Sequence, residues 1–151
     1  MLFYLMALAV VIIDQLLKFL ISKFMVLGQS IPLIDGVLKL TYVRNTGAAF
    51  SLFKGFSPYL AVIGFVIIAV VLFFHYRISS KRILMQTGLA FVLGGSLGNL
   101  LDRLILSHVI DYIDVTVWPV FNFADIMINV GVVLIAFRLF AEEGKYGADL
   151  V

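Results

Sequence analysis

The sequence predicts an α-helical membrane protein with four transmembrane helices and a small extracytoplasmic β-hairpin, or β-cradle, between helices one and two. Hydrophobic residues make up 63% of the 151 residues and charged residues only 13%, and the mean hydropathy is +1.14. Four apolar segments each approach the roughly 20 residues that cross a bilayer. They lie at about 2–21, 59–74, 83–104 and 120–140. All three prolines fall outside these segments, as unbroken helices require. We expect residues 1–151 to form a single membrane-embedded domain.

Composition excludes several classes of partner and of chemistry. The formal net charge is +2, and the eleven Lys and Arg residues are scattered along the chain. No basic run rises to a nucleic-acid patch, so nucleic acid is not an expected partner. Cysteine is absent, which removes disulfides, thiolate nucleophiles and cysteine metal sites. Carboxylates and two histidines remain as candidate catalytic groups.

The first apolar segment is interpreted as a retained transmembrane helix. It is too long for the core of a signal peptide, it carries Asp14 and Lys18, and no small-residue cleavage site follows it. These two residues are four apart with the acid first, the better order for an ion pair on one helix face. We interpret them as a buried pair that fixes helix packing.

The distribution of basic residues in the loops predicts an orientation. The loop at 75–82 carries three Lys or Arg residues, whereas the loop at 105–119 carries none and has two aspartates. Short cytoplasmic loops collect basic residues, so the 75–82 loop and both termini are expected in the cytoplasm. Segment 22–57 then faces outward, although its four basic residues oppose this assignment.

The outer segment at about 29–54 contains a strong hairpin signal. Asp35-Gly36 separates the apolar runs Ile31–Ile34 and Val37–Val43, which predicts two antiparallel strands joined by a two-residue turn. We expect this amphipathic hairpin to lie on the membrane surface. The small residues that follow Asn45, beginning with Gly47, allow the backbone to approach a ligand or a helix end closely.

Polar residues recur at helical spacing in the third and fourth segments. The stripes are Gly95, Asn99 and Asp102, with Arg103 beside them, and Asn122, Asp125 and Asn129. Together with the first helix, three helices therefore turn polar stripes towards a common interior. We interpret the three asparagines as interhelical hydrogen-bonding residues.

Three aspartates are expected to converge near the outer interface. At 1.5 Å per residue, Asp102 lies about 29 Å along the third helix from Ile83, at its outer end. Asp125 lies about one turn into the fourth helix from the same side, and Asp111 lies on the connection between the two helices. Two carboxylates held close share a proton, so that one acts as a base towards water and the other as an acid towards a carbonyl. This is the logic of aspartic peptide-bond hydrolysis.

Residue reasoning alone favours Asp102 as a member of the pair, because it shares a helix stripe with Asn99 and adjoins Arg103, which would hold it ionised. The same arginine argues against Asp102, because a carboxylate kept charged by a cation is a poor sharer of a proton, and Asp102 then fits better as an orienting partner. Asp114 and His108 are expected at the surface of a wet loop. Trp118 is expected to anchor the interface.

Five blocks of the chain resemble the lipoprotein signal peptidases, the type II signal peptidases of bacterial inner membranes (aspartic peptidase family A8). The blocks are Asp14–Lys18, Asn45–Phe50, Gly94–Arg103, Val109–Tyr112 and Phe121–Asp125. The resemblance implies that Asp111 and Asp125 form the catalytic dyad, with Asp102 the next candidate. The supporting or substrate-binding residues that it implies are Asp14, Lys18, Asn45, Gly47, Asn99, Asp102, Arg103 and Asn122.

The resemblance also implies a substrate and a location. A multi-pass protein of the bacterial inner membrane would cleave a diacylglyceryl-modified prolipoprotein on the N-terminal side of the lipidated cysteine, with its site near the outer face. Membrane lipid and the prolipoprotein are then the expected partners, no metal or other cofactor is expected, and the chain is expected to be a monomer.

Two other function classes remain at this stage. A small proton-coupled transporter would also bury carboxylates, but near the bilayer midplane between structural repeats, and no repeat is visible. A metal-dependent protease could use Asp102, Asp111, Asp125 and His108 as ligands. The chain contains no His-Glu-x-x-His motif, the usual zinc-binding motif of metalloproteases, which argues against this class.

Overall fold

The computed structural model describes residues 1–47 and 57–148, and within these the chain forms four helices and three strands. In order they are α1 (Leu2–Phe24), β1 (Ser30–Ile34), β2 (Leu38–Asn45), α2 (Ser57–Arg77), α3 (Ile83–Leu106), β3 (Val109–Asp114) and α4 (Phe123–Ala148). Each helix contains a stretch long and apolar enough to cross a membrane. The four predicted spans are therefore confirmed, and each observed helix extends beyond its predicted C-terminal end.

The boundaries differ from expectation at two places. Pro58 lies inside the first turn of α2, where a missing N–H costs no hydrogen bond. Helix α4 begins at Phe123 and not at about residue 120, so Asn122 precedes the helix and Asp125 lies in its first turn. The end of the predicted outer β segment, including Ala48–Phe50 of the second family block, lies outside the described residues.

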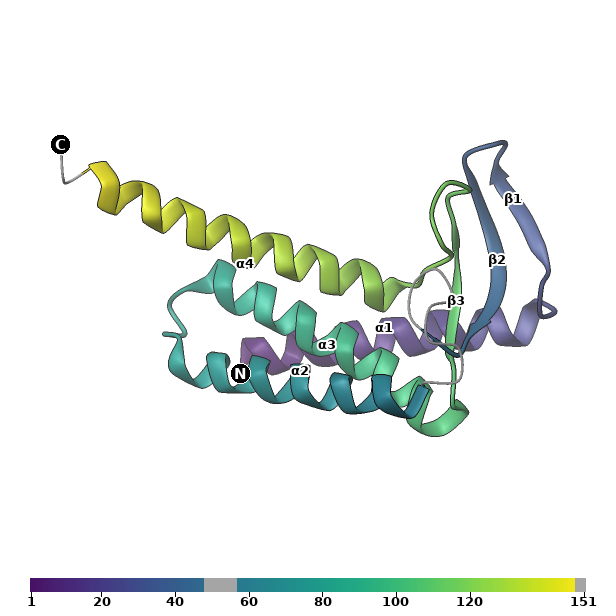
Figure 1. The fold of residues 1–151 in the computed structure, drawn as a ribbon, viewed down its shortest axis with the longest axis horizontal. Helices are drawn as coiled ribbons and strands as arrows, with labels where there is room; N and C mark the ends of the chain where they lie inside the picture. The colour runs from purple at the N-terminus through teal and green to yellow at the C-terminus, as the bar shows by residue number, and fades with distance from the viewer. Residues whose placement is uncertain (48–56, 149–151) are drawn as a thin grey trace.

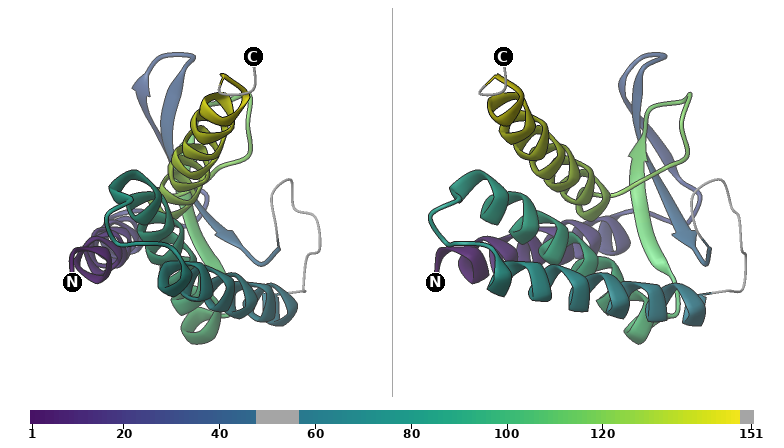
Figure 2. Two further views of the ribbon diagram at one scale, coloured as in Figure 1. Left: turned by 90° about the vertical axis from the view of Figure 1, so that its left-hand side faces the viewer. Right: turned by 60° about the vertical axis from the view of Figure 1, so that its left-hand side comes forward.

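Helix α3 is the centre of the bundle. It packs against α1, α2 and α4, while the sheet stands at one end of the helices. The two further views show the same arrangement, with α4 diverging from α2 towards the C-terminus (Figures 1 and 2). More buried residues belong to α3 than to any other element among the described residues, whereas α1, α2 and α4 expose much of their apolar surface. That distribution suits helices whose outer faces meet lipid.

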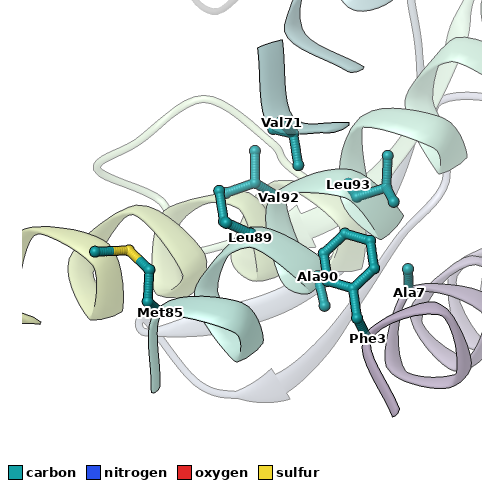
Figure 3. Packing of buried hydrophobic residues seen from close by; sticks show 8 residues of the cluster. All are labelled: Phe3, Ala7, Val71, Met85, Leu89, Ala90, Val92 and Leu93. Atoms are coloured by element: carbon teal, nitrogen blue, oxygen red, sulfur yellow. The ribbon is translucent and has the colours of Figure 1, made fainter. Parts of the chain in front are cut away.

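A cluster of apolar side chains holds the helices together away from the sheet. Phe3 and Ala7 of α1 and Val71 of α2 pack around five residues of α3 (Figure 3).

Close approach of the helices depends on two adjacent glycines of α3. A Cβ at Gly94 would lie 2.7 Å from the Ala7 carbonyl oxygen on α1, and one at Gly95 would lie 2.5 Å from the Ala124 carbonyl oxygen on α4. Small residues thus bring both neighbours against the polar stripe of α3.

The sheet has strand order β1-β2-β3 and is antiparallel throughout. The predicted antiparallel hairpin is confirmed, because Ile31 pairs with Leu40. Its predicted two-residue turn is wrong: Ile34 pairs with Leu38, so three residues (35–37) separate the strands, and Gly36 there has a φ of +73°, a conformation that favours glycine. The strand β2 also pairs with β3, where Val43 lies opposite Asp111. One side of the sheet packs on the end of α1 through a cluster of Met25, Tyr42, Ile110 and Tyr112.

The segment at 105–119 was expected to be a wet loop, but part of it forms the strand β3. Residues Val109 to Tyr112 are buried because β3 pairs with β2 as a strand of the sheet and packs against α1 and α3. Its partner strand lies some 66 residues earlier in the chain, and local pattern carries no signal of such a distant pairing. Asp114, expected at the wet surface, is half-buried at the end of β3 and accepts a hydrogen bond from Thr41 Oγ1 at 2.7 Å.

Candidate active site

Asp111 and Asp125 line one cavity at the sheet end of the bundle. Its volume is about 700 Å³, and strand β3, the 118–121 segment and the start of α4 form much of its wall. Asp111 is supplied by the middle of β3 and is 3% exposed, whereas Asp125 is supplied by the first turn of α4. The two residues come from elements that meet only in the folded protein. Further polar lining residues are Asn45, Asn99, Arg103 and Asn129.

Two asparagine amides link the two carboxylates. Asn122 Nδ2 donates to Asp111 Oδ1 at 2.7 Å, and Asn99 Nδ2 donates to Asp125 Oδ1 at 2.8 Å. The amides also contact each other, because Asn122 Nδ2 lies 3.1 Å from Asn99 Oδ1. For Asn99 and Asn122 this confirms the predicted hydrogen-bonding role between elements. It also fixes both carboxyl groups relative to one another.

Asn122 and Asp125 form a reciprocal cap at the start of α4. The Asp125 N–H donates to Asn122 Oδ1 at 3.0 Å, and the Asn122 N–H donates to Asp125 Oδ2 at 3.1 Å. This is the geometry of a capping box, with an asparagine and an aspartate in the two roles. The N-terminal end of a helix dipole stabilises a negative charge. The capping box therefore holds the Asp125 carboxyl group at the N-terminal end of α4.

Asp111 has a different environment. Its Oδ2 accepts a hydrogen bond from Asn45 Nδ2 at 2.9 Å, and Asn45 is itself oriented by the Gly47 N–H, 2.9 Å from Asn45 Oδ1. Burial and the nearby negative charge of Asp125 raise the pKa of Asp111 to about 7, although the Asn45 and Asn122 amides oppose the shift. At neutral pH the pair can therefore hold one proton.

Lys18 organises a second, closed group of carboxylates behind the amides. Its Nζ lies 2.8 Å from Asp14 Oδ2, 2.9 Å from Asp102 Oδ2 and 2.9 Å from Asn99 Oδ1. These contacts use all three donors of an ammonium group. Asp14 is 0% exposed and Lys18 is 2% exposed, which confirms the predicted buried pair and adds Asp102 to it.

The remaining acceptors of this closed group tie distant elements together. Asp14 Oδ1 accepts the Ala124 N–H at the start of α4 at 3.0 Å, and Asp102 Oδ2 accepts the Ile110 N–H of β3 at 3.2 Å. Gln15 Nε2 donates to Asp102 Oδ1 at 2.9 Å. No role was assigned to Gln15 from the sequence, because its partner on α3 is set by helix packing.

Asp102 and Arg103 do not form the expected pair. Within the described residues, Lys18 is the cation that bridges Asp102, whereas Arg103 lines the cavity and donates to the Asn99 carbonyl oxygen at 3.3 Å. Asp102 does not line this cavity. All three aspartates do meet at one end of the bundle, as predicted, but only two of them face the open space.

Three more residues were singled out by the sequence: Asn129, His108 and Trp118. Asn129 is exposed and donates to the Asp125 carbonyl oxygen of its own helix, so its predicted interhelical role is wrong. His108 Nδ1 lies 2.8 Å from the Leu106 carbonyl oxygen. Among the side chains that the structure describes (1–47 and 58–141), no three His, Asp or Glu residues are grouped so that they could hold a metal ion. Trp118 is exposed at the wall of the cavity.

Comparisons with known proteins agree with this geometry. The model of the family described as signal peptidase (SPase) II matches residues 6–141. The lipoprotein signal peptidase of Halothermothrix orenii is 40% identical over 93% of this chain and 96% of its own length. That of Moorella thermoacetica is 39% identical over 97% of this chain and 98% of its own.

Solved structures give the same result at the level of the fold. A bacterial membrane enzyme determined in meso at 2.3 Å resolution superposes with a TM-score of 0.88 at 32% identity, over 93% of this chain and 88% of that one. A second, at 1.9 Å resolution, has a TM-score of 0.82 at 33% identity, over 89% of this chain and 90% of that one. The chain, with its four membrane helices and small antiparallel sheet, therefore belongs to the signal peptidase II family and is a membrane peptidase.

Proposed function

We propose that this protein removes the signal peptide from diacylglyceryl-modified prolipoproteins, cleaving on the N-terminal side of the lipidated cysteine with a water molecule activated by Asp111 and Asp125. The observation that carries the proposal is the pair of carboxyl groups facing one cavity, linked by Asn122 and Asn99. Neither carboxyl is bridged by an ammonium or guanidinium group among the described residues.

We assign the roles of the two carboxyl groups from their different environments. Asp125, at the helix N-terminus, is the base and takes a proton from water as the water oxygen attacks the carbonyl carbon of the substrate. Asp111, whose pKa is raised to about 7, remains protonated in part of the molecules at neutral pH and donates its proton to the carbonyl oxygen. Collapse of the tetrahedral intermediate returns that proton to Asp111. The C–N bond then breaks as Asp125 gives its proton to the leaving nitrogen.

The closed group around Lys18 acts as a scaffold for this chemistry. Lys18 holds Asn99 Oδ1, which directs the Asn99 Nδ2 donor to Asp125. Asp14 accepts the Ala124 N–H at the start of α4, and Asp102 accepts the N–H of Ile110, next to Asp111. Both catalytic elements are thereby positioned from behind by a group whose cation, Lys18, does not line the cavity.

We propose that the sheet end faces outward in the bacterial inner membrane and that both termini are cytoplasmic. The basic loop at 75–82 joins the helix ends opposite the sheet, which agrees with cytoplasmic enrichment of Lys and Arg. A lipid-anchored peptide then reaches the cavity laterally from the bilayer. Asp111 lies on a strand outside the helical spans, unlike the midplane site of a transporter.

Purified protein reconstituted with a lipidated prolipoprotein tests this proposal. We expect Asp111→Asn and Asp125→Asn each to lower kcat by roughly 10²- to 10⁴-fold, because each removes an acid or base from the transition state. Asp114→Asn, on the same strand as Asp111 but outside the cavity lining, is the matched control and should cleave normally. Full activity in either dyad variant would disprove the mechanism. Activity that disappears with a strong chelator would instead favour a metal-dependent protease.

A further inference from the structure

Asn129 is a polar side chain placed on a lipid-exposed part of α4. Its neighbours Ile126 and Val130 are 36% and 40% exposed, and all three line the cavity that contains Asp111 and Asp125. Asn129 lies within the membrane-capable stretch Phe123–Ala141. A polar group at such a site is costly unless it has a partner, so its presence points to a function.

The hydrogen bonding of Asn129 leaves part of its amide available. One Nδ2 hydrogen goes to the Asp125 carbonyl oxygen at 2.8 Å, and this bond turns the amide towards the dyad end of α4. A side-chain amide has a second Nδ2 hydrogen and a carbonyl oxygen. Within the described part of the chain, neither of these makes a hydrogen bond. Both remain for a molecule that enters the cavity.

The position of Asn129 selects the part of the substrate that it can reach. It lies four residues after Asp125, about 6 Å deeper along the helix. An extended peptide covers that distance in about two residues. In a substrate cleaved at the dyad, this depth holds either the backbone just before the cleaved bond or the ester groups of the attached lipid. Both present carbonyl oxygens that have lost their water in the bilayer.

We propose that Asn129 is a substrate-binding residue whose free Nδ2 hydrogen is donated to a carbonyl oxygen of the substrate, about one helical turn below the cleaved bond. The proposal rests on the proposed function, since it takes the cleaved bond to lie at Asp111 and Asp125. Asn129 contributes to binding and not to proton transfer. The bond exists in the bound substrate as well as in the transition state, so its loss raises KM and leaves kcat unchanged.

The test compares Asn129→Leu with the unsubstituted protein on a lipidated prolipoprotein peptide. We expect KM to rise roughly fivefold, the effect of one net hydrogen bond, with kcat within about twofold. The control Val133→Leu changes an exposed residue one turn further along α4, outside the cavity lining, and should leave both constants unchanged. Equal KM values for Asn129→Leu and the unsubstituted protein would overturn the assignment, as would a fall in kcat alone.

A binding measurement identifies the source of the carbonyl and separates the two proposals. In an Asp125→Asn background, which cannot cleave, Kd is measured with and without Asn129→Leu for a diacylglyceryl peptide and for the same peptide without lipid. A loss of affinity for both peptides assigns the contact to the backbone, and a loss confined to the lipidated peptide assigns it to an ester. No loss for either overturns the proposal. If the unsubstituted protein cleaves no lipidated peptide at all, the proposed function fails first.

Discussion

Two groups of aspartates at the same end of this bundle differ in their partners and in their surroundings. Asp14 and Asp102 share the ammonium group of Lys18 and lie away from the large cavity, whereas Asp111 and Asp125 accept hydrogen bonds from amides and line it. An ammonium partner holds a carboxylate ionised, while a neutral amide leaves it free to exchange a proton. The same side chain therefore serves as scaffold in one group, and we propose that it serves as acid or base in the other.

Removing the cation should have the largest effect on the scaffold. We expect Lys18→Met to destabilise the protein by about 3–5 kcal/mol, because it leaves two buried carboxylates without a counter-charge. Unfolding in detergent, followed by denaturant titration, measures the loss. Adding Asp14→Asn and Asp102→Asn to Lys18→Met should recover part of it. If Lys18→Met is as stable as the parent, the ammonium does not organise this group.

The pH dependence of cleavage should follow the protonation of Asp111, in the other group of aspartates. Because the pKa of Asp111 is about 7, the fraction of enzyme with a protonated Asp111 falls about tenfold per pH unit above that value. We expect kcat/KM to fall with the same slope in reconstituted vesicles. A rate that stays constant from pH 7 to pH 9 would contradict the assignment of Asp111 as the acid.

The same raised pKa predicts how stability varies with pH. A carboxyl whose pKa rises from 3.8 in the unfolded chain to about 7 in the folded protein favours folding while it is protonated in both states. That contribution is lost as the pH rises from about 4 to about 7. The stability difference between the parent and Asp111→Asn should therefore shift against the parent across this range and stay level above it. Paired unfolding curves at several pH values measure this difference.

Asp14→Asn should destabilise the protein less than Lys18→Met does. The amide oxygen can still accept from Lys18 or from the Ala124 N–H, so the loss is that of a charge-assisted hydrogen bond, about 2 kcal/mol. We expect lower expression and a lower melting temperature, with residual activity in the folded fraction. An inactive Asp14→Asn variant with undiminished stability would place Asp14 with the catalytic pair instead.

The smallest effect is expected at Asp114, which belongs to neither group. Its carboxylate accepts hydrogen bonds from Thr41 Oγ1 at 2.7 Å and from the Thr116 N–H at 2.9 Å, and these contacts lower its pKa. Stability from them is present above the ordinary pKa and is lost as the pH falls through the lowered value. Because Asp114 is only half-buried and keeps part of its surface in solvent, Asp114→Asn should cost less than about 1 kcal/mol. Thermal unfolding of the parent and of Asp114→Asn at pH 7 and at pH 3 would measure this difference in stability.

Local pattern predicted the helices and the hairpin because their signals are contained in short stretches. Apolar length marks a membrane helix, and Asp35-Gly36 between apolar runs marks a turn. The Asp14 and Lys18 pair was predictable for the same reason, since residues four apart share a helix face. The strand β3 was not predictable in this way, because its hydrogen bonds are made with residues far away in the chain.

The site itself was predicted unevenly. Composition and depth brought Asp102, Asp111 and Asp125 to one end, and the family blocks selected the last two as catalytic. The link through Asn122 and Asn99 had no local signal, because Asn122 turned out to precede α4 and to cap it. The roles of Gln15 and Arg103 were also missed or misassigned, since their partners depend on which faces of α1 and α3 meet.

The sequence by itself determined that this is a four-helix membrane protein, and its blocks determined the family. The tertiary structure decided how the charges are divided. Adjacent glycines on α3 let α1 and α4 approach from two sides, so that Lys18 reaches Asp14, Asp102 and Asn99 but not the cavity. A charge buried in a membrane protein must find its partner within a few ångströms, and those distances exist only once the helices are packed.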